Sequence, residues 1–170
     1  SKPFRMANRV IPWENDMVMF HRWCEGKTGF PLIDAAMTQL NTTGYMHNKM
    51  RVLTSSFLVK ILLIDYRFGE EYFASKLLDF DLAVNNSGWQ WSASCGVESQ
   101  MANRVLNPAQ QISLLDPLCK YIQKYLPVFK GIPPSMVQNP IMHEEELLCM
   151  GVELGVDYPY PIVDFKTERE

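Results

Sequence analysis

The chain has 170 residues, of which 47% are hydrophobic and 12% aromatic, and its formal net charge is −3. This length suits one domain, or part of one, with a real core, and the composition excludes a disordered chain. The acidic balance excludes a generally basic nucleic-acid-binding surface, so any contact with nucleic acid must come from a local patch.

The cysteines and the apolar runs exclude two further classes of protein. The 4 cysteines lie far apart, and neither they nor the 3 histidines form a metal-ligand spacing. We therefore expect free thiols, no metal and a reducing compartment, either the cytoplasm or the nucleus. The most apolar run, 57–64, is interrupted by Lys60 and is too short to span a bilayer. No secretory signal is recognisable, so we expect an intracellular protein without a membrane partner.

The first quarter of the chain predicts two short helices. Residues 1–12 are expected to be irregular, and the polar residues at 13–16 can begin a helix. The turn at 25–29 contains Gly, Lys and Thr but lacks the spacing of a phosphate-binding loop. Pro31 suits the first position of the next helix, and Gly44 suits its end.

A long, largely buried helix is predicted over 45–66. Asn48, Arg51 and Ser55 follow one another at i, i+3 and i+7, so they share a face that is distinct from the apolar stripe. An arginine on so apolar a helix needs either an acidic partner or an anionic ligand. The acids within 79–81 are the candidate partners.

The stretch 78–91 combines two acids, two amides, a glycine and two tryptophans. Asp81, Asn85 and Trp89 follow the spacing i, i+4, i+8, which places them on one face of a helix. A carboxylate, an amide and an indole on one face suit a flat, polar, redox-active ligand. The structural alternative is a capped helix end with buried aromatic residues.

The remaining segments are predicted to be short helices joined by irregular chain. In chain order we expect a break at 67–70, a helix at 71–78, an extended connector at 92–107, a helix beginning at Asp116–Pro117, a Pro-rich loop at 130–140, a short helix at 141–150 and an extended tail at 158–164. No segment has a convincing strand pattern, so the predicted class is all-α, a helical cluster.

Several motifs follow one another in a recognisable order: WCEGKTGFP at 23–31, DAAM at 34–37, GYMHNKMR at 44–51, SFLVK at 56–60 and LDFDLAVNNSGWQW at 78–91. Together with Asn107–Pro108 and YPYPIV at 158–163, they resemble the C-terminal flavin-binding domain of the DNA photolyase/cryptochrome family. The similarity covers most of 3–126. It makes 1–170 a single partial FAD-binding domain with a C-terminal loop, short helix and tail at 127–170. The motifs at 46–48 and 85–91 resemble class I cyclobutane pyrimidine dimer photolyases more than (6-4) photolyases.

This resemblance implies FAD bound in a helical cluster and electron transfer from the light-excited, reduced flavin to a pyrimidine dimer flipped out of DNA. The implied activity is that of a deoxyribodipyrimidine photolyase, a lyase, and the implied partner is damaged DNA containing pyrimidine dimers. Two alternatives remain open. One is a cryptochrome-like blue-light photoreceptor, and the other is an inactive truncated remnant with weak FAD binding or none.

The resemblance also assigns roles to individual residues. The flavin-binding positions are Asn48, Arg51, Asp79, Phe80, Asp81 and Asn85, with Asn85 facing the flavin N5 atom. The DNA-facing positions are Asn48, Lys49, Trp91 and Gln111, with Trp91 beside the dimer. Asn85 and Trp91 are thus the implied catalytic residues.

An electron relay is implied from Trp89 through Tyr66 to Trp13. Relatives carry tryptophan where Tyr66 stands, and an oxidised tyrosine must lose its phenolic proton. The family's antenna domain and its Ser/Thr-rich segment for the FAD phosphates have no counterpart in the sequence. We therefore expect firm FAD binding to need an upstream segment or chain that completes the pocket.

Overall fold

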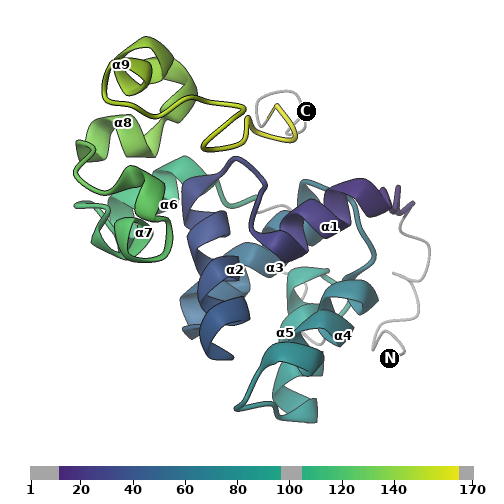
Figure 1. Ribbon diagram of the computed structural model, residues 1–170. Coiled ribbons are helices and arrows are strands. Elements are labelled where there is room, and N and C mark those ends of the chain that lie inside the picture. The colour runs from purple at the N-terminus through teal and green to yellow at the C-terminus, as the bar shows by residue number, and fades with distance from the viewer. Residues whose placement is uncertain (1–11, 97–104, 165–170) are drawn as a thin grey trace.

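The computed structural model describes residues 12–96 and 105–164, and the regular structure in this part of the chain is helical. In chain order the elements are α1 (Met17–Glu25), α2 (Pro31–Thr43), α3 (Asn48–Lys60), α4 (Tyr66–Lys76), α5 (Leu82–Ser92), α6 (Pro108–Leu115), α7 (Lys120–Tyr125), the 3-10 turn η2 (Pro127–Phe129), α8 (Pro134–Gln138), the 3-10 turn η3 (Pro140–His143) and α9 (Glu144–Cys149) (Figure 1). Strand-like pairing among the described residues is limited to an isolated bridge between Leu154 and Tyr158. The predicted all-α class is confirmed.

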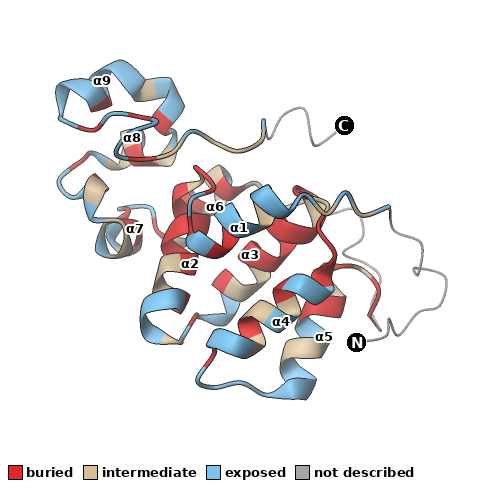
Figure 2. Ribbon diagram, turned by 45° about the vertical axis from the view of Figure 1, so that its right-hand side comes forward, coloured by how far each residue is buried: buried red, intermediate tan, exposed pale blue. Residues whose placement is uncertain are grey.

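Helices α2 and α3 form the centre of the molecule. Helix α2 packs against α1, α3, α6 and α7, while α3 packs against α4 and α5, which also pack on each other. Most residues of α2 and α3 are buried, and Figure 2 shows this burial concentrated where the helices meet. The α3, α4 and α5 cluster therefore forms one side of the molecule, and α6 to α9 form the other (Figure 1).

The start and end signals predicted near the beginning of the chain are confirmed. The Asp16 carboxylate accepts hydrogen bonds from the first-turn N–H groups of α1, with the bond from Val18 at 2.8 Å. Pro31 opens α2, and Gly44 ends it with a φ of +66°, in the left-handed region that favours glycine.

The predicted long helix over 45–66 is correct for 48–60 and wrong at both ends. Helix α3 ends at Lys60, and the chain turns at 61–65, where Leu63 has a φ of +48°. The Asp65 carboxylate then caps a new helix by accepting a hydrogen bond from Arg67 N at 3.0 Å. Because this cap starts α4 at Tyr66, the predicted break at 67–70 is helical instead.

The helix predicted to begin at Asp116–Pro117 is also wrong. Asp116 ends α6, and its side chain accepts a hydrogen bond from Ile122 N at 2.9 Å, while the following helix begins only at Lys120. Helix α6 itself starts at Asn107–Pro108, a capping residue followed by proline at the first helical position, which the predicted connector overlooked.

Four other predicted segments either differ from the structure or lie outside the described residues. The predicted loop at 130–140 contains α8, and the predicted helix at 141–150 divides into η3 and α9. The predicted irregular start at 1–12 falls almost wholly on 1–11, and the middle of the connector falls on 97–104, so both lie outside the described residues.

The C-terminal segment is joined to the centre through Asp34, which is fully buried. Its carboxylate accepts hydrogen bonds from Thr28 N at 2.7 Å, Thr28 Oγ1 at 2.6 Å, Gly29 N at 2.9 Å and the Tyr158 hydroxyl at 2.7 Å. Ile162 N adds a backbone bond to Thr28 O at 2.9 Å. Residues distant in sequence thus share one buried carboxylate at the start of α2.

Candidate functional site

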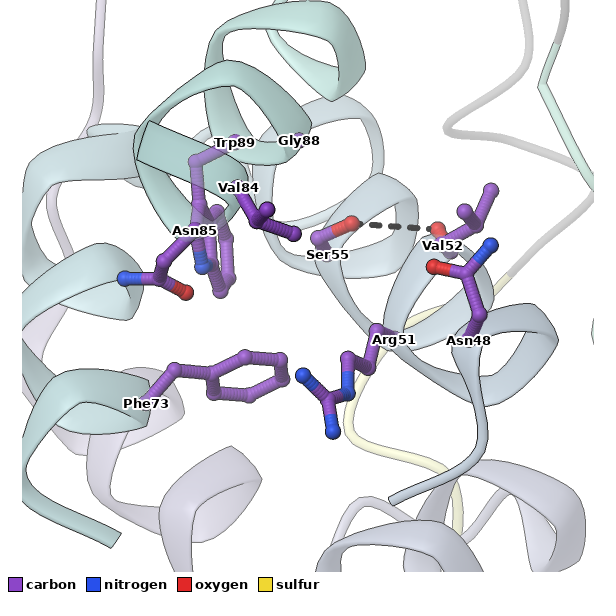
Figure 3. Close-up of a pocket in the computed structure, with 9 residues that line it drawn as sticks. All are labelled: Asn48, Arg51, Val52, Ser55, Phe73, Val84, Asn85, Gly88 and Trp89. Carbon is purple, nitrogen blue, oxygen red and sulfur yellow. Dashed lines mark hydrogen bonds between the residues drawn. The ribbon is translucent and has the colours of Figure 1, made fainter. Parts of the chain in front are cut away.

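A cavity of about 60 Å³ lies among α3, α4 and α5, and we call it the α3–α5 cavity. Its lining residues are Asn48, Arg51, Val52, Ser55, Phe73, Val84, Asn85, Gly88 and Trp89 (Figure 3). In Figure 3, Phe73, Asn85 and Trp89 lie on one side, and Asn48, Arg51 and Ser55 lie on the α3 side. The face predicted on α3 therefore meets the face predicted on α5.

Arg51 is held in one orientation by groups from two loops. Its Nε donates to Met46 O at 2.7 Å, and its Nη2 donates to both carboxylate oxygens of Asp79, at 2.9 and 2.7 Å. The guanidinium also lies 5.9 Å from the centre of the Tyr45 ring. The acidic partner expected for Arg51 is thus Asp79, and the pair places a fixed cation at the cavity.

Asp81 determines where α5 begins. It is the N-cap residue, and its Oδ1 accepts a hydrogen bond from Val84 N at 2.8 Å. Asn85 and Trp89 follow one and two turns later and both line the cavity, so two of the three residues predicted to share a face do so. Asp81 itself does not line the cavity.

The amide of Asn85 is oriented by α4. Its Nδ2 donates to Glu70 O at 3.0 Å, and in Figure 3 its oxygen points into the cavity. The neighbouring Asn86 donates to Glu70 Oε1 at 2.8 Å, and Gln90 donates to Asn86 Oδ1 at 2.9 Å. The two bonds to Glu70 join α5 to α4. The oxygen of Asn85 remains as a hydrogen-bond acceptor that faces the cavity.

Trp89 is buried among aromatic rings and beside a glycine. Its ring centre lies 5.0 Å from that of Phe73 and 6.1 Å from that of Trp23, both in edge-to-face geometry. A Cβ at Gly69 would lie 2.2 Å from the Trp89 ring. Gly69 is therefore required by the close approach of the indole and does not break the helix.

The predicted DNA-facing residues occupy different parts of the structure. Asn48 and Lys49 are exposed in the first turn of α3, where Lys49 N donates to the capping His47 side chain at 3.2 Å. Trp91 is half-buried near the end of α5 and is not among the residues that line the cavity. Gln111 lies on α6, which packs against α2 and α8, so the cavity does not include it.

The outer relay positions lie on segments that touch each other. Glu14 N donates to Leu63 O at 2.9 Å, and Asp65 N donates to the Asn15 side chain at 2.9 Å. These bonds bring the half-buried Trp13 segment beside the start of α4, where Tyr66 is buried.

Three contributors to the site were not predicted: Glu70, Phe73 and Gly69. Each lies on α4, where the sequence analysis placed a break followed by an ordinary apolar helix. Within the part of the chain that the structure describes, no group of His, Cys, Asp or Glu side chains could hold a metal ion. No helix in that part has the length and apolar character that crossing a bilayer requires.

The residues present suit one side of a flavin. They offer an aromatic surface at Phe73 and Trp89, an amide acceptor at Asn85, and a fixed cation at Arg51. The nearby apolar side chains of Leu78, Phe80, Leu82 and Val84 are exposed. A three-ring flavin is larger than a cavity of about 60 Å³, so the described residues form one wall of such a site.

The comparisons with known proteins identify the family of this chain. A family described as the FAD binding domain of DNA photolyase matches residues 1–170. The deoxyribodipyrimidine photo-lyase of Escherichia coli is 45% identical over 168 residues, which is 99% of this chain and 34% of that protein. The chain thus spans about a third of the length of this relative.

Solved structures show the same arrangement of helices. The class III photolyase of Agrobacterium tumefaciens superposes with a TM-score of 0.95 at 36% identity, over 99% of this chain and 35% of that one. A cryptochrome of Synechocystis superposes with a TM-score of 0.87 at 39% identity, over 93% of this chain and 33% of that one. With its full length matched by the family and its helices superposed on these structures, the chain belongs to the FAD-binding domain family of the DNA photolyases.

Proposed function

We propose that this chain forms one wall of the FAD pocket of a light-driven DNA photolyase that splits cyclobutane pyrimidine dimers. The observation that carries the proposal is one cavity lined by Arg51 fixed on Asp79, by the amide oxygen of Asn85 and by the indole of Trp89. Since the chain spans 34% of its Escherichia coli relative, an upstream segment or a second chain would supply the opposite wall.

We further propose that 1–170 acts as a single partial FAD-binding domain. Its match to the family would centre on about 3–126, and the loop, short helix and tail at 127–170 would brace α2. The bond from the Tyr158 hydroxyl to Asp34 supports this division, because it fastens the tail to α2.

We also propose that the chain is located in the cytoplasm or the nucleus. The free state of all four cysteines supports this location, because a reducing compartment keeps thiols unpaired.

Bound FAD would supply the absorption of light and the electron. The Asn85 oxygen would accept a hydrogen bond from the N–H at flavin N5, and donation to Glu70 O keeps that oxygen facing the cavity. The Arg51–Asp79 pair would hold charges of both signs beside the ring, with Phe80 and Asp81 on the same loop. Phe73 and Trp89 would exclude water from this face.

The DNA would approach past the first turn of α3. There Lys49 would contact a phosphate, Asn48 would lie between flavin and base, and Trp91 would stack beside the flipped dimer. Gln111, on the far side of α2, would reach only more distant DNA. Because the net charge is −3, affinity would depend on these local contacts rather than on the overall field.

The proposal is tested by cofactor uptake and then by repair. The purified chain is titrated with FAD, alone and with a second polypeptide carrying the remainder of the Escherichia coli relative, and flavin absorbance is recorded. The reduced complex is then illuminated with dimer-containing DNA, and we expect monomeric pyrimidines to return only in the light. Asn85→Ala should lose this repair while keeping its helical circular dichroism. A chain that stays colourless under both conditions is an inactive remnant, contrary to the proposal.

The second candidate is a photoreceptor, which the 39% identity with the Synechocystis cryptochrome favours. It predicts FAD uptake and light-driven flavin reduction without dimer splitting. Trp91→Ala separates the two, because it should abolish repair in a photolyase and leave flavin photoreduction unchanged in either protein.

A further inference from the structure

Trp23 joins Trp89 to the molecular surface through consecutive ring contacts. Its ring centre lies 6.1 Å from that of Trp89 and 5.8 Å from that of Tyr72, in edge-to-face geometry in both cases. Trp23 has no exposed surface, whereas Tyr72 is half-buried and its hydroxyl reaches the exposed Asn41. Three oxidisable side chains, Trp89, Trp23 and Tyr72, thus lead outward from the α3–α5 cavity.

The surroundings of two tyrosines, Tyr66 and Tyr72, differ in how close each hydroxyl lies to solvent. Tyr66 is 4% exposed and hydrogen-bonds to Cys95, a thiol that stays protonated because burial raises its pKa. The Tyr72 hydroxyl donates to Asn41 Oδ1 at 2.6 Å and to Cys24 O at 2.9 Å, at the edge of solvent. Oxidation of Tyr72 can therefore release a proton to water.

The surroundings of Trp23 favour transfer of an electron alone. Its Nε1–H donates to Thr54 O at 3.1 Å, and a backbone carbonyl does not remove a proton from it. Lys76 Nζ lies 5.5 Å from the centre of the Tyr72 ring, so positive charge is disfavoured there and proton loss from an oxidised Tyr72 is favoured. Trp23 would thus be oxidised to a radical cation only transiently, and the oxidation would end as a neutral Tyr72 radical.

We propose that Trp23 and Tyr72 carry an electron relay from Trp89 to the surface of this chain. Trp89 would give one electron to bound, light-excited flavin; Trp23 then gives one electron to oxidised Trp89, and Tyr72 gives one to oxidised Trp23. The Tyr72 phenolic proton leaves to water past Asn41, and an external thiol later returns a hydrogen atom to the Tyr72 radical. The first of these steps rests on the proposed flavin function, whereas the steps between side chains do not.

The first experiment uses the FAD-loaded protein, with its completing segment if required, and follows radical spectra after a laser flash. We expect a tyrosyl radical to appear as the tryptophan radical decays. Tyr72→Phe should abolish the tyrosyl signal, and Trp23→Phe should abolish it while the first tryptophan radical recombines quickly with the flavin. Tyr66→Phe should retain the signal. Loss of the signal in Tyr66→Phe, together with its survival in Tyr72→Phe, would overturn the proposal.

The second experiment needs no cofactor and so separates this inference from the proposed function. The FAD-free chain is oxidised at tryptophan by azide radicals from pulse radiolysis, and conversion to tyrosyl radical is recorded. Tyr72→Phe should lose the fast tyrosyl phase, whereas Tyr125→Phe, a control on α7, should keep it. Trp23→Phe should also lose the fast tyrosyl phase, provided that its circular dichroism matches that of the parent chain. An unchanged fast phase in Tyr72→Phe contradicts the relay whether or not the chain binds FAD.

Discussion

At the scale of single residues, the site depends on pairs that fix each other's orientation. Arg51 and Asp79 form one such pair, and Asn85 with the Glu70 carbonyl forms another. The Arg51 partner could be predicted, because a cation on a mostly apolar helix needs an anion and the motif at 78–91 offers Asp79 and Asp81. The Asn85 partner could not, since it is a backbone carbonyl on a helix that the sequence analysis divided incorrectly.

The Arg51–Asp79 pair is expected to matter more for the cofactor than for stability. The two side chains are 21% and 49% exposed, and pairs of this kind contribute at most about 1 kcal/mol to the free energy of unfolding. Asp79→Asn should therefore change urea stability by less than about 1 kcal/mol while weakening FAD binding in a titration. The control is Glu25→Gln, which removes an exposed pair with Lys27 and should affect neither. Equal FAD affinity in Asp79→Asn and the parent would contradict a flavin role for Asp79.

A second prediction at this scale concerns the two helical glycines near the cavity. A Cβ at Gly69 would lie 2.2 Å from Trp89 and 2.7 Å from Leu58, whereas a Cβ at Gly88 would meet nothing within 4 Å. Gly69→Ala should destabilise the fold by about 1–3 kcal/mol despite its better helix propensity. Gly88→Ala should be neutral or stabilising by up to about 1 kcal/mol. Urea unfolding followed by tryptophan fluorescence measures both, and similar values for the two variants would refute this packing argument.

At the scale of elements, the helix ends determined which predictions succeeded. Gly44 and Asp16 carry the local signals of a stop and a start, and the structure uses both. The division between α3 and α4 contains no glycine or proline. Leu63 adopts the left-handed conformation there instead. Apolar periodicity continues across this turn, so the sequence reads as one helix. The start of α4 does carry a local signal, the capping Asp65, which the predicted long helix overlooked, and tertiary hydrogen bonds to Leu63 O and from Asp65 N hold the turn.

Leu63 is therefore expected to be strained. A non-glycine residue with a φ of +48° costs about 1–2 kcal/mol, and asparagine tolerates this region better. Leu63→Asn should raise the free energy of unfolding by up to about 1 kcal/mol, the strain relieved being partly offset by lost apolar burial. The same change at the buried Leu62 should instead cost at least about 2 kcal/mol. Destabilisation of similar size at both positions would show that packing, rather than backbone strain, governs Leu63.

At the scale of the whole molecule, the chain has two sides with different tasks. The α3–α5 side carries the candidate flavin wall and exposed apolar residues such as Phe80, Leu82 and Val84. The α6–α9 side is fastened to the central α2 by the buried carboxylate of Asp34, with Tyr158 as the most distant donor in sequence. The motif that contains Tyr158 was recognised from sequence, but its attachment to Asp34 links residues too far apart for any local pattern to reveal.

The Tyr158–Asp34 bond should make the attachment of the tail depend on pH. Burial raises the pKa of Asp34 above its ordinary value of 3.8, although hydrogen bonds from Thr28 and Tyr158 oppose that rise. The contribution of Asp34 to stability is thus fully present below the unfolded pKa and is lost as pH rises through the folded pKa. Removal of one donor raises the folded pKa further. Tyr158→Phe should therefore cost about 1.5–3 kcal/mol at neutral pH and less near pH 4, because a hydrogen bond to an ionised carboxylate is stronger than one to a protonated carboxylic acid. Urea unfolding at both pH values measures this difference in the free energy of unfolding.

The control Tyr160→Phe loses only an exposed bond to Glu144, so its free energy of unfolding should stay close to that of the parent at both pH values. A pH-independent loss in Tyr158→Phe would mean that Tyr158 acts through packing alone.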